Sequence, residues 1–348
     1  MTDPATPYLR VDVGRLRDNI ARTAAAAAAA GVALRPHAKT HKSADVARLQ
    51  LEAGAVGLTV ATVGEAEAFA EQGCTDLFVA YPLWLTDALA DRLAALAGSG
   101  VRLAIGVDSL AGAEKAAALL AGSGVELVVE VDSGHHRSGI APGLAGDVAL
   151  AAGDLTVLGV FTFPGHSYSP DGRAAAARDE AVALAAGRAS LGAAGLTDLV
   201  VSGGSTPSLE HADASVLTEL RPGVYVFNDA QQWELGSAAP DQVALTAVAT
   251  VVSHAGGRLV LDAGSKVLGA DRASYATGFG RLLDHPDARI VQLSEHHAVV
   301  ELPGTLPALG SRVLVVPNHC CTAANLADEL WPTDGDAPWP VTARGRNT

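Results

Sequence analysis

The chain has few cysteines, no long apolar run and fewer basic than acidic residues. Three cysteines among 348 residues are too few for a disulfide framework, which is typical of a reducing compartment. No apolar run approaches the roughly 20 residues that span a bilayer, and Met1-Thr2-Asp3-Pro4 does not begin a secretory signal. The formal net charge of −14 disfavours binding to nucleic acid or to an anionic membrane. We therefore expect a cytoplasmic protein with no nucleic-acid or membrane partner.

Short apolar runs alternate with helical patterns through the first part of the chain. Eight such runs are present: Val32–Ala38, Val56–Val60, Leu77–Tyr81, Val101–Val107, Val125–Val131, Leu155–Phe163, Leu199–Ser202 and Gly223–Phe227. Helical patterns separate most of them, among them Ser43–Ala53, Thr86–Leu96, Leu110–Leu120 and Arg173–Ala194. Continuous apolar strands that alternate with helices indicate a parallel sheet, so the pattern predicts an α/β fold, a closed (β/α)8 barrel of the TIM type.

The pattern changes after about Pro240. Helical periodicity becomes weak, and turn residues join five β-rich segments: Val243–Ser253, Arg258–Asp262, Arg289–Gln292, Ala298–Leu302 and Arg312–Val316. We predict two domains, a barrel over residues 1–240 and a mostly antiparallel β-domain over residues 241–348.

Residues capable of chemistry follow several of the predicted barrel strands. In barrels of this kind the reaction takes place at the carboxyl ends of the strands. The segments concerned are Lys39 after the first run, Asp132–Arg137 after the fifth, Pro164–Tyr168 after the sixth, Ser202–Pro207 after the seventh, and Tyr225 within the eighth. Their common position predicts one active site at that end of the barrel.

Lys39 lies in a basic segment, Arg35–Ala44, that contains a second lysine and two histidines. Neighbouring cations favour loss of the lysine proton near neutral pH, and the free amine is then a nucleophile for the aldehyde of pyridoxal phosphate (PLP). A solvated basic turn is the alternative interpretation. The other segments at the same end of the barrel favour the first one.

Three further segments suit a flat, phosphorylated cofactor. The guanidinium of Arg137 keeps its proton and suits a phenolate oxygen or a pyridine nitrogen. Tyr168 and His166 are suited to stacking or hydrogen bonding, although each also fits a buried core position. Gly203-Gly204-Ser205-Thr206 presents backbone N–H groups and hydroxyls to a phosphate, although such turns are common.

The segment Pro317-Asn318-His319-Cys320-Cys321-Thr322 suggests a metal site. If it is extended, His319 and Cys321 face the same way and Cys320 points elsewhere. Imidazole and thiolate together favour zinc over magnesium or calcium. Two ligands are too few for a structural zinc site, but they leave positions for water and substrate, as a catalytic metal requires. The alternative is that the cysteines are small buried hydrophobic residues.

Together these motifs resemble the D-serine dehydratase and D-threonine aldolase group of fold type III PLP enzymes, whose barrel and β-domain are shared with alanine racemase. The resemblance covers nearly the whole chain and is carried by Pro36–Lys42, Gly134–Gly139, Gly165–Tyr168, Ser202–Pro207 and Pro317–Cys321. It implies that Lys39 binds PLP covalently and that Arg137 and Tyr168 contact the cofactor ring. It also implies that Gly203 to Thr206 and Tyr225 hold the phosphate, and that His319 and Cys321 bind the metal.

Within this group, the resemblance implies that the second metal ligand separates the branches. Dehydratase-like members have a metal-binding motif similar to His-x-Cys, whereas aldolase-like members have one similar to His-x-Asp. Cys321 therefore favours a D-serine dehydratase-like lyase, which would remove water from a D-3-hydroxy amino acid and yield a keto acid and ammonia. A D-threonine aldolase-type cleavage to glycine and an aldehyde is the first alternative. The resemblance further implies a homodimer and zinc, with manganese or cobalt as alternatives.

Two other classes fit less well. A non-catalytic PLP carrier resembles a barrel without an added β-domain, which disagrees with the β-rich segments after Pro240. A metal-free racemase of this fold needs a tyrosine as its second base, and Tyr275 is the only tyrosine in the later part of the chain.

Overall fold

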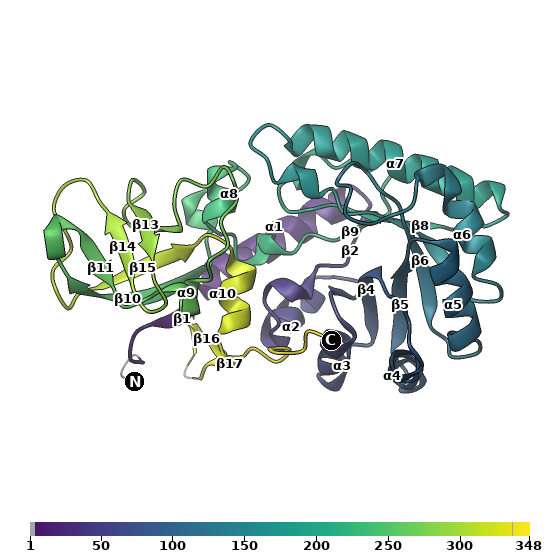
Figure 1. The fold of residues 1–348 in the computed structure, drawn as a ribbon, viewed down its shortest axis with the longest axis horizontal. Helices are drawn as coiled ribbons and strands as arrows, with labels where there is room; N and C mark the ends of the chain where they lie inside the picture. The colour runs from purple at the N-terminus through teal and green to yellow at the C-terminus, as the bar shows by residue number, and fades with distance from the viewer. Residues whose placement is uncertain (1–3, 336) are drawn as a thin grey trace. The chain divides into compact units, whose positions relative to one another are not determined.

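The computed structural model describes residues 4–335 and 337–348, which form two compact units (Figure 1). The barrel unit contains Thr23–Lys39, Gln50–Gly223 and Arg346–Thr348, and the β unit contains Met1–Arg22, Thr40–Leu49 and Val224–Gly345. These units assign the N-terminal segment and residues 224–240 to the β unit, whereas the domain boundaries at 1–240 and 241–348 stay a prediction. The expectation about export falls mainly on Met1–Asp3, which lie outside the described residues.

Parallel strands form the sheet of the barrel unit, in the order β2-β9-β8-β7-β6-β5-β4-β3 (Figure 1). Their bounds are β2 Ala33–Leu34, β3 Leu58–Val60, β4 Asp76–Pro82, β5 Arg102–Val107, β6 Glu126–Glu130, β7 Val157–Phe161, β8 Val200–Gly203 and β9 Glu219–Leu220. Thr59 N donates to Pro36 O at 2.9 Å, and His37 forms a parallel bridge with Thr59. Since these bonds join the two ends of the sheet, the predicted α/β barrel is confirmed.

The α-helices up to residue 193 are α1 Val13–Ala29, α2 Ala44–Glu52, α3 Val63–Glu71, α4 Asp87–Gly98, α5 Leu110–Leu120, α6 Ala145–Ala151 and α7 Arg173–Ala193. Four helices, α2, α4, α5 and α7, begin and end within two residues of the helical patterns named in the sequence, and no bounds were predicted for α1, α3 and α6. Thr62, Thr86 and Ser109 cap α3, α4 and α5, each accepting a hydrogen bond from a backbone N–H in the first turn. Among the described residues, no helix combines the length and the apolarity that crossing a membrane requires.

One predicted barrel strand is wrong. The run Gly223–Phe227 contains a 3-10 helix, Val224–Val226, and the eighth strand is instead the two-residue β9. Phe227 N and Asn228 N both donate to Val224 O, and Asn228 has a left-handed φ of 52°. The run is apolar because Val224 to Phe227 are buried in the core of the β unit, and apolarity alone does not separate a strand from another buried segment.

A second, mostly antiparallel sheet forms the β unit, as predicted. The five predicted segments correspond to β10 Leu245–Ser253, β11 Leu259–Leu261, β13 Arg289–Leu293, β14 Ala298–Glu301 and β15 Arg312–Pro317. The sequence analysis missed β1 Tyr8–Val11, β12 Gly280–Leu282, β16 Glu329–Pro332 and β17 Trp339–Pro340. The strand β1 pairs antiparallel with β10 and parallel with β16, so β1 belongs to this sheet and not to the barrel.

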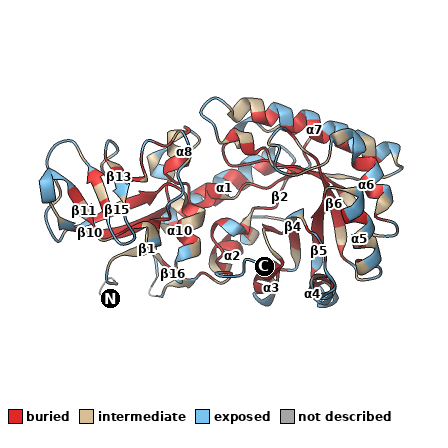
Figure 2. Ribbon diagram, in the orientation of Figure 1, coloured by how far each residue is buried: buried red, intermediate tan, exposed pale blue. Residues whose placement is uncertain are grey.

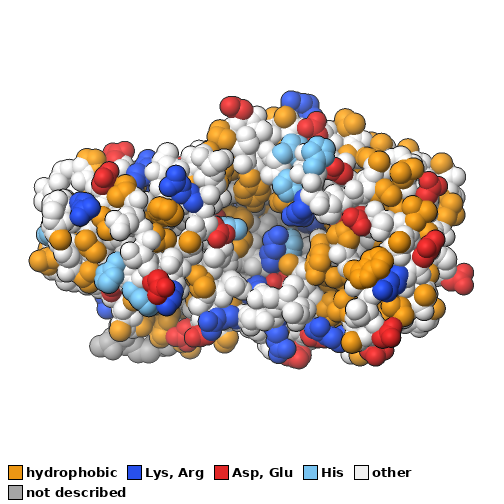
Figure 3. Space-filling model, viewed as in Figure 1, with side chains coloured by type: hydrophobic (Ala, Val, Ile, Leu, Met, Phe, Trp, Pro, Cys, Tyr) orange, Lys and Arg blue, Asp and Glu red, His pale blue; other side chains and the backbone are white. Residues whose placement is uncertain are grey.

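Each unit has its own buried core, drawn in red in Figure 2. Inside the barrel, Phe78 and Phe161 contact each other edge to face, with ring centroids 5.0 Å apart. The guanidinium of Arg221 lies beside both rings and is fully enclosed, where its Nε donates to Ser202 Oγ at 2.8 Å. On the outer face shown in Figure 3, acidic and basic side chains are interspersed, so the net negative charge forms no continuous acidic patch there.

Candidate active site

Lys39 follows the first barrel strand, in the short 3-10 helix Ala38–Thr40. Its Nζ lies 5.8 Å from the centroid of the Phe163 ring. Together with Arg137, His37 and Tyr81 it lines a cavity of about 450 Å³ within the barrel unit. This volume lies in the range of small-molecule and cofactor sites. The predicted position of Lys39 at the carboxyl end of the barrel strands is therefore matched by a cavity of suitable size.

A hydrogen-bonded turn holds Arg137 beside the same ring. Asp132 Oδ1 accepts from Gly134 N at 2.9 Å and from His136 N at 3.1 Å, and Asp132 Oδ2 lies 2.6 Å from His136 Nδ1. Burial raises the pKa of Asp132, but these hydrogen bonds outweigh burial and lower the pKa below its ordinary value. The turn brings the Arg137 guanidinium to 5.3 Å from the Phe163 centroid. Arg137 is thus placed as a fixed cation in the cavity that Lys39 lines.

His166 and Tyr168 lie in the next loop, at the 3-10 helix Gly165–Ser167. The Tyr168 ring is 6.3 Å from the Phe163 ring, tilted by 44°. His166 Nε2 lies 3.2 Å from Asp179 Oδ2, while its Nδ1 is buried and has no partner among the described residues. The structure therefore brings Tyr168 to Phe163 and pairs His166 with an acidic residue of α7.

Phe163 is the residue that the sequence analysis missed. Besides Lys39, Arg137 and Tyr168, the His135 ring packs edge to face against it at 5.7 Å. A Cβ on Gly165 would come within 2.6 Å of the His135 ring, so this glycine lets the imidazole lie against the loop backbone. The only sequence signal was that Phe163 ends the apolar run Leu155–Phe163. An aromatic residue just beyond a strand end can serve the site as well as the core.

The loop Gly203 to Thr206 has much of its hydrogen-bonding capacity engaged within the barrel unit. Gly204 N donates to Glu180 Oε1 at 2.6 Å, Ser205 N donates to Ser208 Oγ at 3.2 Å, and the Ser205 hydroxyl lies 2.8 Å from that of Ser167. Glu180, on α7, is fully buried, and burial raises its pKa to about 7. Phosphate binding by Gly203 to Thr206 stays a prediction, and Glu180 is the neighbour that the sequence analysis did not anticipate.

Tyr225 lies in the β unit, in the 3-10 helix Val224–Val226, and is buried in the core of that unit. Its predicted role beside the phosphate stays a prediction.

His319 and Cys321 face each other, but not for the predicted reason. The extended backbone ends at His319, and helix α10, Cys320–Leu326, begins at the next residue. Cys320 is buried in the first turn, where its N–H donates to Asp229 Oδ2 at 3.0 Å. The Cys321 thiol lies 3.4 Å from Thr40 Oγ1. The alternation of an extended strand was therefore the wrong argument, since a helical turn places the two side chains together.

These two side chains influence each other electrostatically. The negative charge of Cys321 raises the pKa of His319 to about 10, although burial opposes this shift. Hydrogen bonding from Cys320 and the charge of His319 lower the pKa of Cys321. Each side chain thus favours the charged form of the other, and a divalent cation bound to both would displace the imidazole proton. Among the described residues, no group of three or more His, Cys, Asp or Glu side chains is arranged to hold a metal.

Family comparisons cover both parts of the chain. Residues 11–231 match the N-terminal domain of alanine racemase, and residues 244–332 match the putative serine dehydratase domain. The first match alone exceeds half of the chain. The chain therefore belongs to the alanine racemase-like, fold type III family of PLP-dependent enzymes, in the branch that carries a serine dehydratase domain.

Individual relatives are similar over nearly their full length. D-threo-3-hydroxyaspartate dehydratase from Delftia sp. (strain HT23) is 35% identical in sequence, over 91% of this chain and 90% of the dehydratase chain. The solved structure of that dehydratase has a TM-score of 0.89 and covers 97% of both chains. A cysteine-to-alanine variant of a D-threo-3-hydroxyaspartate dehydratase, solved in a metal-free form, is 32% identical, with a TM-score of 0.88 over 97% of both chains. A 3-hydroxy-D-aspartate aldolase from Paracoccus denitrificans is 31% identical over 98% of this chain and 92% of its own. D-threonine aldolase from Filomicrobium marinum is 30% identical, with a TM-score of 0.86 over 98% of this chain and 96% of its own.

Proposed function

We propose that the protein is a PLP- and divalent-metal-dependent lyase that removes water from a D-3-hydroxy amino acid and releases a keto acid and ammonia. The observation that carries the proposal is the imidazole and thiolate pair of His319 and Cys321, a donor set that suits zinc. The relatives support it, because the Delftia protein is named a dehydratase and a cysteine variant of a D-threo-3-hydroxyaspartate dehydratase occurs in a metal-free form. Zinc is the expected ion, with manganese or cobalt as alternatives.

The described residues fit the cofactor at its aldehyde end. Lys39 and Arg137 line a cavity of about 450 Å³ and both lie beside Phe163, so an amine, a fixed cation and an aromatic face are available together. When bound there, PLP supplies an electron sink for the carbanion that forms at Cα. In the proposed reaction Lys39 would hold the cofactor through its Nζ, and the same amine would take up the α-proton of the substrate.

The remaining proposed roles follow from charge and donor type. Arg137 holds an anionic or lone-pair atom of the cofactor ring without giving up its proton. His319 and Cys321 would hold a cation whose role is to polarise the β-hydroxyl, because hydroxide is a poor leaving group.

Substrates with a second carboxylate, such as 3-hydroxy-D-aspartate, are the preferred candidates, since the Delftia and Paracoccus relatives are both named for this compound. The homodimer and the cytoplasmic location stay predictions.

Retro-aldol cleavage to glycine and an aldehyde is the second candidate. It is favoured by the Paracoccus and Filomicrobium relatives, which are named as aldolases at 31% and 30% identity. Both reactions use the same lysine and the same metal, so the products and not the residues separate them.

Removing the proposed thiolate ligand tests the metal requirement. For Cys321→Ala we expect PLP absorbance to persist while turnover falls by about 100-fold or more, because the Lewis acid is lost. A strong chelator should reduce the activity of the unmodified protein similarly, and added zinc should restore it.

Cys74→Ala is the matched control for this change. Cys74 is buried in the barrel unit, where desolvation raises the pKa of its thiol to about 11, so it has no thiolate to offer a metal. Its replacement should leave both activity and metal content unchanged. Full activity of Cys321→Ala, or of the chelated protein, would rule out a catalytic metal.

A further inference from the structure

A loop of the β unit holds the imidazole of His319 from the side. The loop follows α9, Ser265–Leu268, and precedes β12. Its Asp271 Oδ2 lies 2.9 Å from His319 Nδ1 and accepts a hydrogen bond from Thr322 Oγ1 at 2.7 Å. The same carboxylate oxygen of Asp271 therefore contacts both His319 and Thr322. Because Nδ1 is engaged by Asp271, Nε2 is the ring nitrogen that remains for a cation.

Asn318 fixes the backbone of this loop next to the histidine. Its Nδ2 donates to Gly278 O at 2.7 Å and to Asp271 O at 3.3 Å, so a single amide nitrogen connects both ends of the segment 271–278. Asn318 is only 3% exposed, and its backbone carbonyl oxygen accepts a hydrogen bond from Gln231 N at 3.2 Å. The residue that precedes His319 thus determines where the carboxylate of Asp271 lies.

The loop also approaches helix α10 closely at its start. Gly269 has a φ of 75°, which favours glycine, and a Cβ there would come within 2.7 Å of Thr322 Cγ2. The first turn of α10 is anchored independently of Asp271, because Cys320 N donates to Asp229 Oδ2 and Asp229 Oδ1 accepts from Gln232 N at 2.9 Å. Removing the Asp271 carboxylate should consequently leave the helix in place and release only the imidazole and the Thr322 hydroxyl.

We propose that Asp271 is a positioning residue for the metal site: it fixes the tautomer and orientation of His319, and Asn318 holds Asp271 in register. This inference rests on the proposed function, since it takes His319 as a metal ligand. A carboxylate on the far nitrogen of a ligating imidazole makes the ring more basic and keeps its lone pair directed at the ion. Loss of such a partner typically weakens metal binding by about 10–100-fold.

The test measures zinc affinity of the full-length protein by competition with a chromophoric chelator, without substrate. Asp271→Ala should weaken zinc binding by about 10–100-fold, and Asp271→Asn should weaken it less, because its amide oxygen still accepts from Nδ1–H. Thr322→Val removes the hydrogen bond from the Thr322 hydroxyl to Asp271 but keeps the carboxylate. It should therefore weaken zinc binding less than Asp271→Asn does. Glu295→Gln is the control, because it removes an exposed carboxylate of the same unit, one that pairs with Lys266 and not with His319. It should leave zinc affinity unchanged.

A spectroscopic measurement separates positioning from a general loss of structure. In the zinc-bound protein, NMR of ¹⁵N-labelled histidine should show His319 coordinated through Nε2 and protonated at Nδ1, and in zinc-bound Asp271→Ala the Nδ1–H signal should shift and exchange faster with solvent, because its carboxylate acceptor is gone. If Asp271→Ala does not fold, Asp271→Asn and Thr322→Val provide the same comparison. Unchanged zinc affinity and an unchanged Nδ1–H signal of His319 in folded Asp271→Ala would overturn the inference.

His319→Ala distinguishes failure of this inference from failure of the proposed function. If His319→Ala loses zinc and Asp271→Ala does not, only the positioning role is wrong. If His319→Ala binds zinc as tightly as the unmodified protein, the proposed metal site is wrong, and the role of Asp271 is wrong with it.

Discussion

Lys39→Ala should abolish the ~420 nm absorbance of lysine-bound PLP and reduce turnover by roughly 10²–10⁴-fold or more. The expected loss is large because one amine is proposed both to bind the cofactor aldehyde and to remove the α-proton. The measurement is an absorbance spectrum of the purified protein with added PLP, together with an activity assay.

Lys115→Ala is the matched control. Lys115 is on α5 of the same unit, and its Nζ lies 4.5 Å from the centroid of the exposed Trp84 ring. Replacing it removes a lysine of the barrel unit that does not line the cavity of Lys39, so the spectrum and activity should not change. An unaltered cofactor spectrum in Lys39→Ala would refute the assignment of the PLP lysine.

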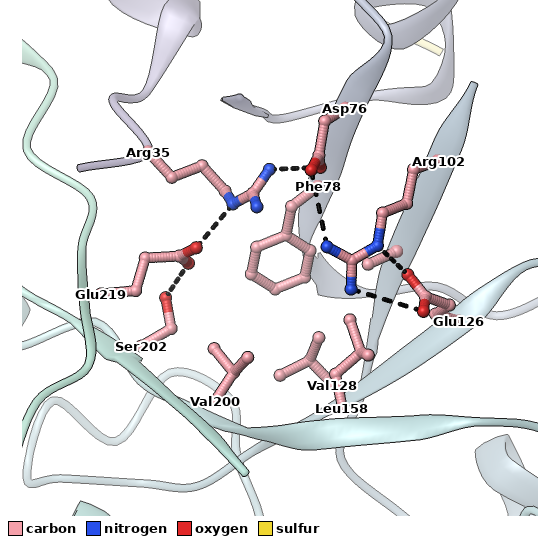
Figure 4. A pocket seen from close by; sticks show the side chains of 11 residues that line it. Arg35, Asp76, Phe78, Arg102, Glu126, Val128, Leu158, Val200, Ser202 and Glu219 are labelled. Atoms are coloured by element: carbon pink, nitrogen blue, oxygen red, sulfur yellow. Dashed lines mark hydrogen bonds and ion pairs between the residues drawn. The ribbon is translucent and has the colours of Figure 1, made fainter. Parts of the chain in front are cut away.

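Arg35→Met should lower the free energy of unfolding by about 3–5 kcal/mol, because it leaves the buried carboxylate of Glu219 without its cation at the amino-terminal end of the barrel strands, whereas Asp76 keeps Arg102 at 3.5 Å. Arg35 Nε donates to Glu219 Oε2 at 2.7 Å and its Nη1 to Asp76 Oδ1 at 2.5 Å (Figure 4). Burial lowers the pKa of Arg35, but Glu219 and Asp76 outweigh burial and raise it, so the guanidinium stays charged. The measurement is the urea midpoint followed by circular dichroism.

Arg102→Met provides the comparison. Arg102 and Arg35 line the same small cavity at this end of the barrel (Figure 4). Arg102 Nε pairs with Glu126 Oε2 at 2.8 Å, but half of the Arg102 side chain is exposed (50%) (Figure 4). Exposed ion pairs contribute about 0–1 kcal/mol, so this variant should unfold close to the unmodified protein. Equal destabilisation by the two variants would contradict the importance of burial at Arg35. Because the proposed chemistry lies at the other end of the strands, the PLP spectrum of folded Arg35→Met should be unchanged.

The sequence predicted the barrel well because its strands are buried on both faces and are therefore continuously apolar. It failed where that rule does not hold. The strand β9 is only two residues long and begins with Glu219, which pairs with Arg35, so no apolar run marks it. The apolar run Gly223–Phe227 predicts a strand instead, although the side chains of Val224 to Phe227 are buried in the core of the β unit. The strand β1 is four residues long, and its partners β10 and β16 are more than 200 residues away in sequence.

The candidate site was predictable in its residue types but not in its contacts. Reactive and charged residues after strand ends identified Lys39 and Arg137, and the spacing of His319 and Cys321 indicated a shared ligand position. No local pattern could show that Phe163 lies beside both cations, because that contact joins three loops distant in sequence. Asp271 was also missed, since its pairing with His319 spans 48 positions of the chain.

Product analysis tests the central claim most directly. The purified protein, supplied with PLP and zinc, should be incubated separately with D-threo-3-hydroxyaspartate, D-serine and D-threonine, and keto acid, ammonia and glycine should be quantified. We predict equal amounts of keto acid and ammonia from at least one substrate, without glycine, and loss of both products in Lys39→Ala. Glycine and an aldehyde without keto acid would contradict dehydration and favour the aldolase, and absence of all these products would contradict a lyase acting on these three D-3-hydroxy amino acids.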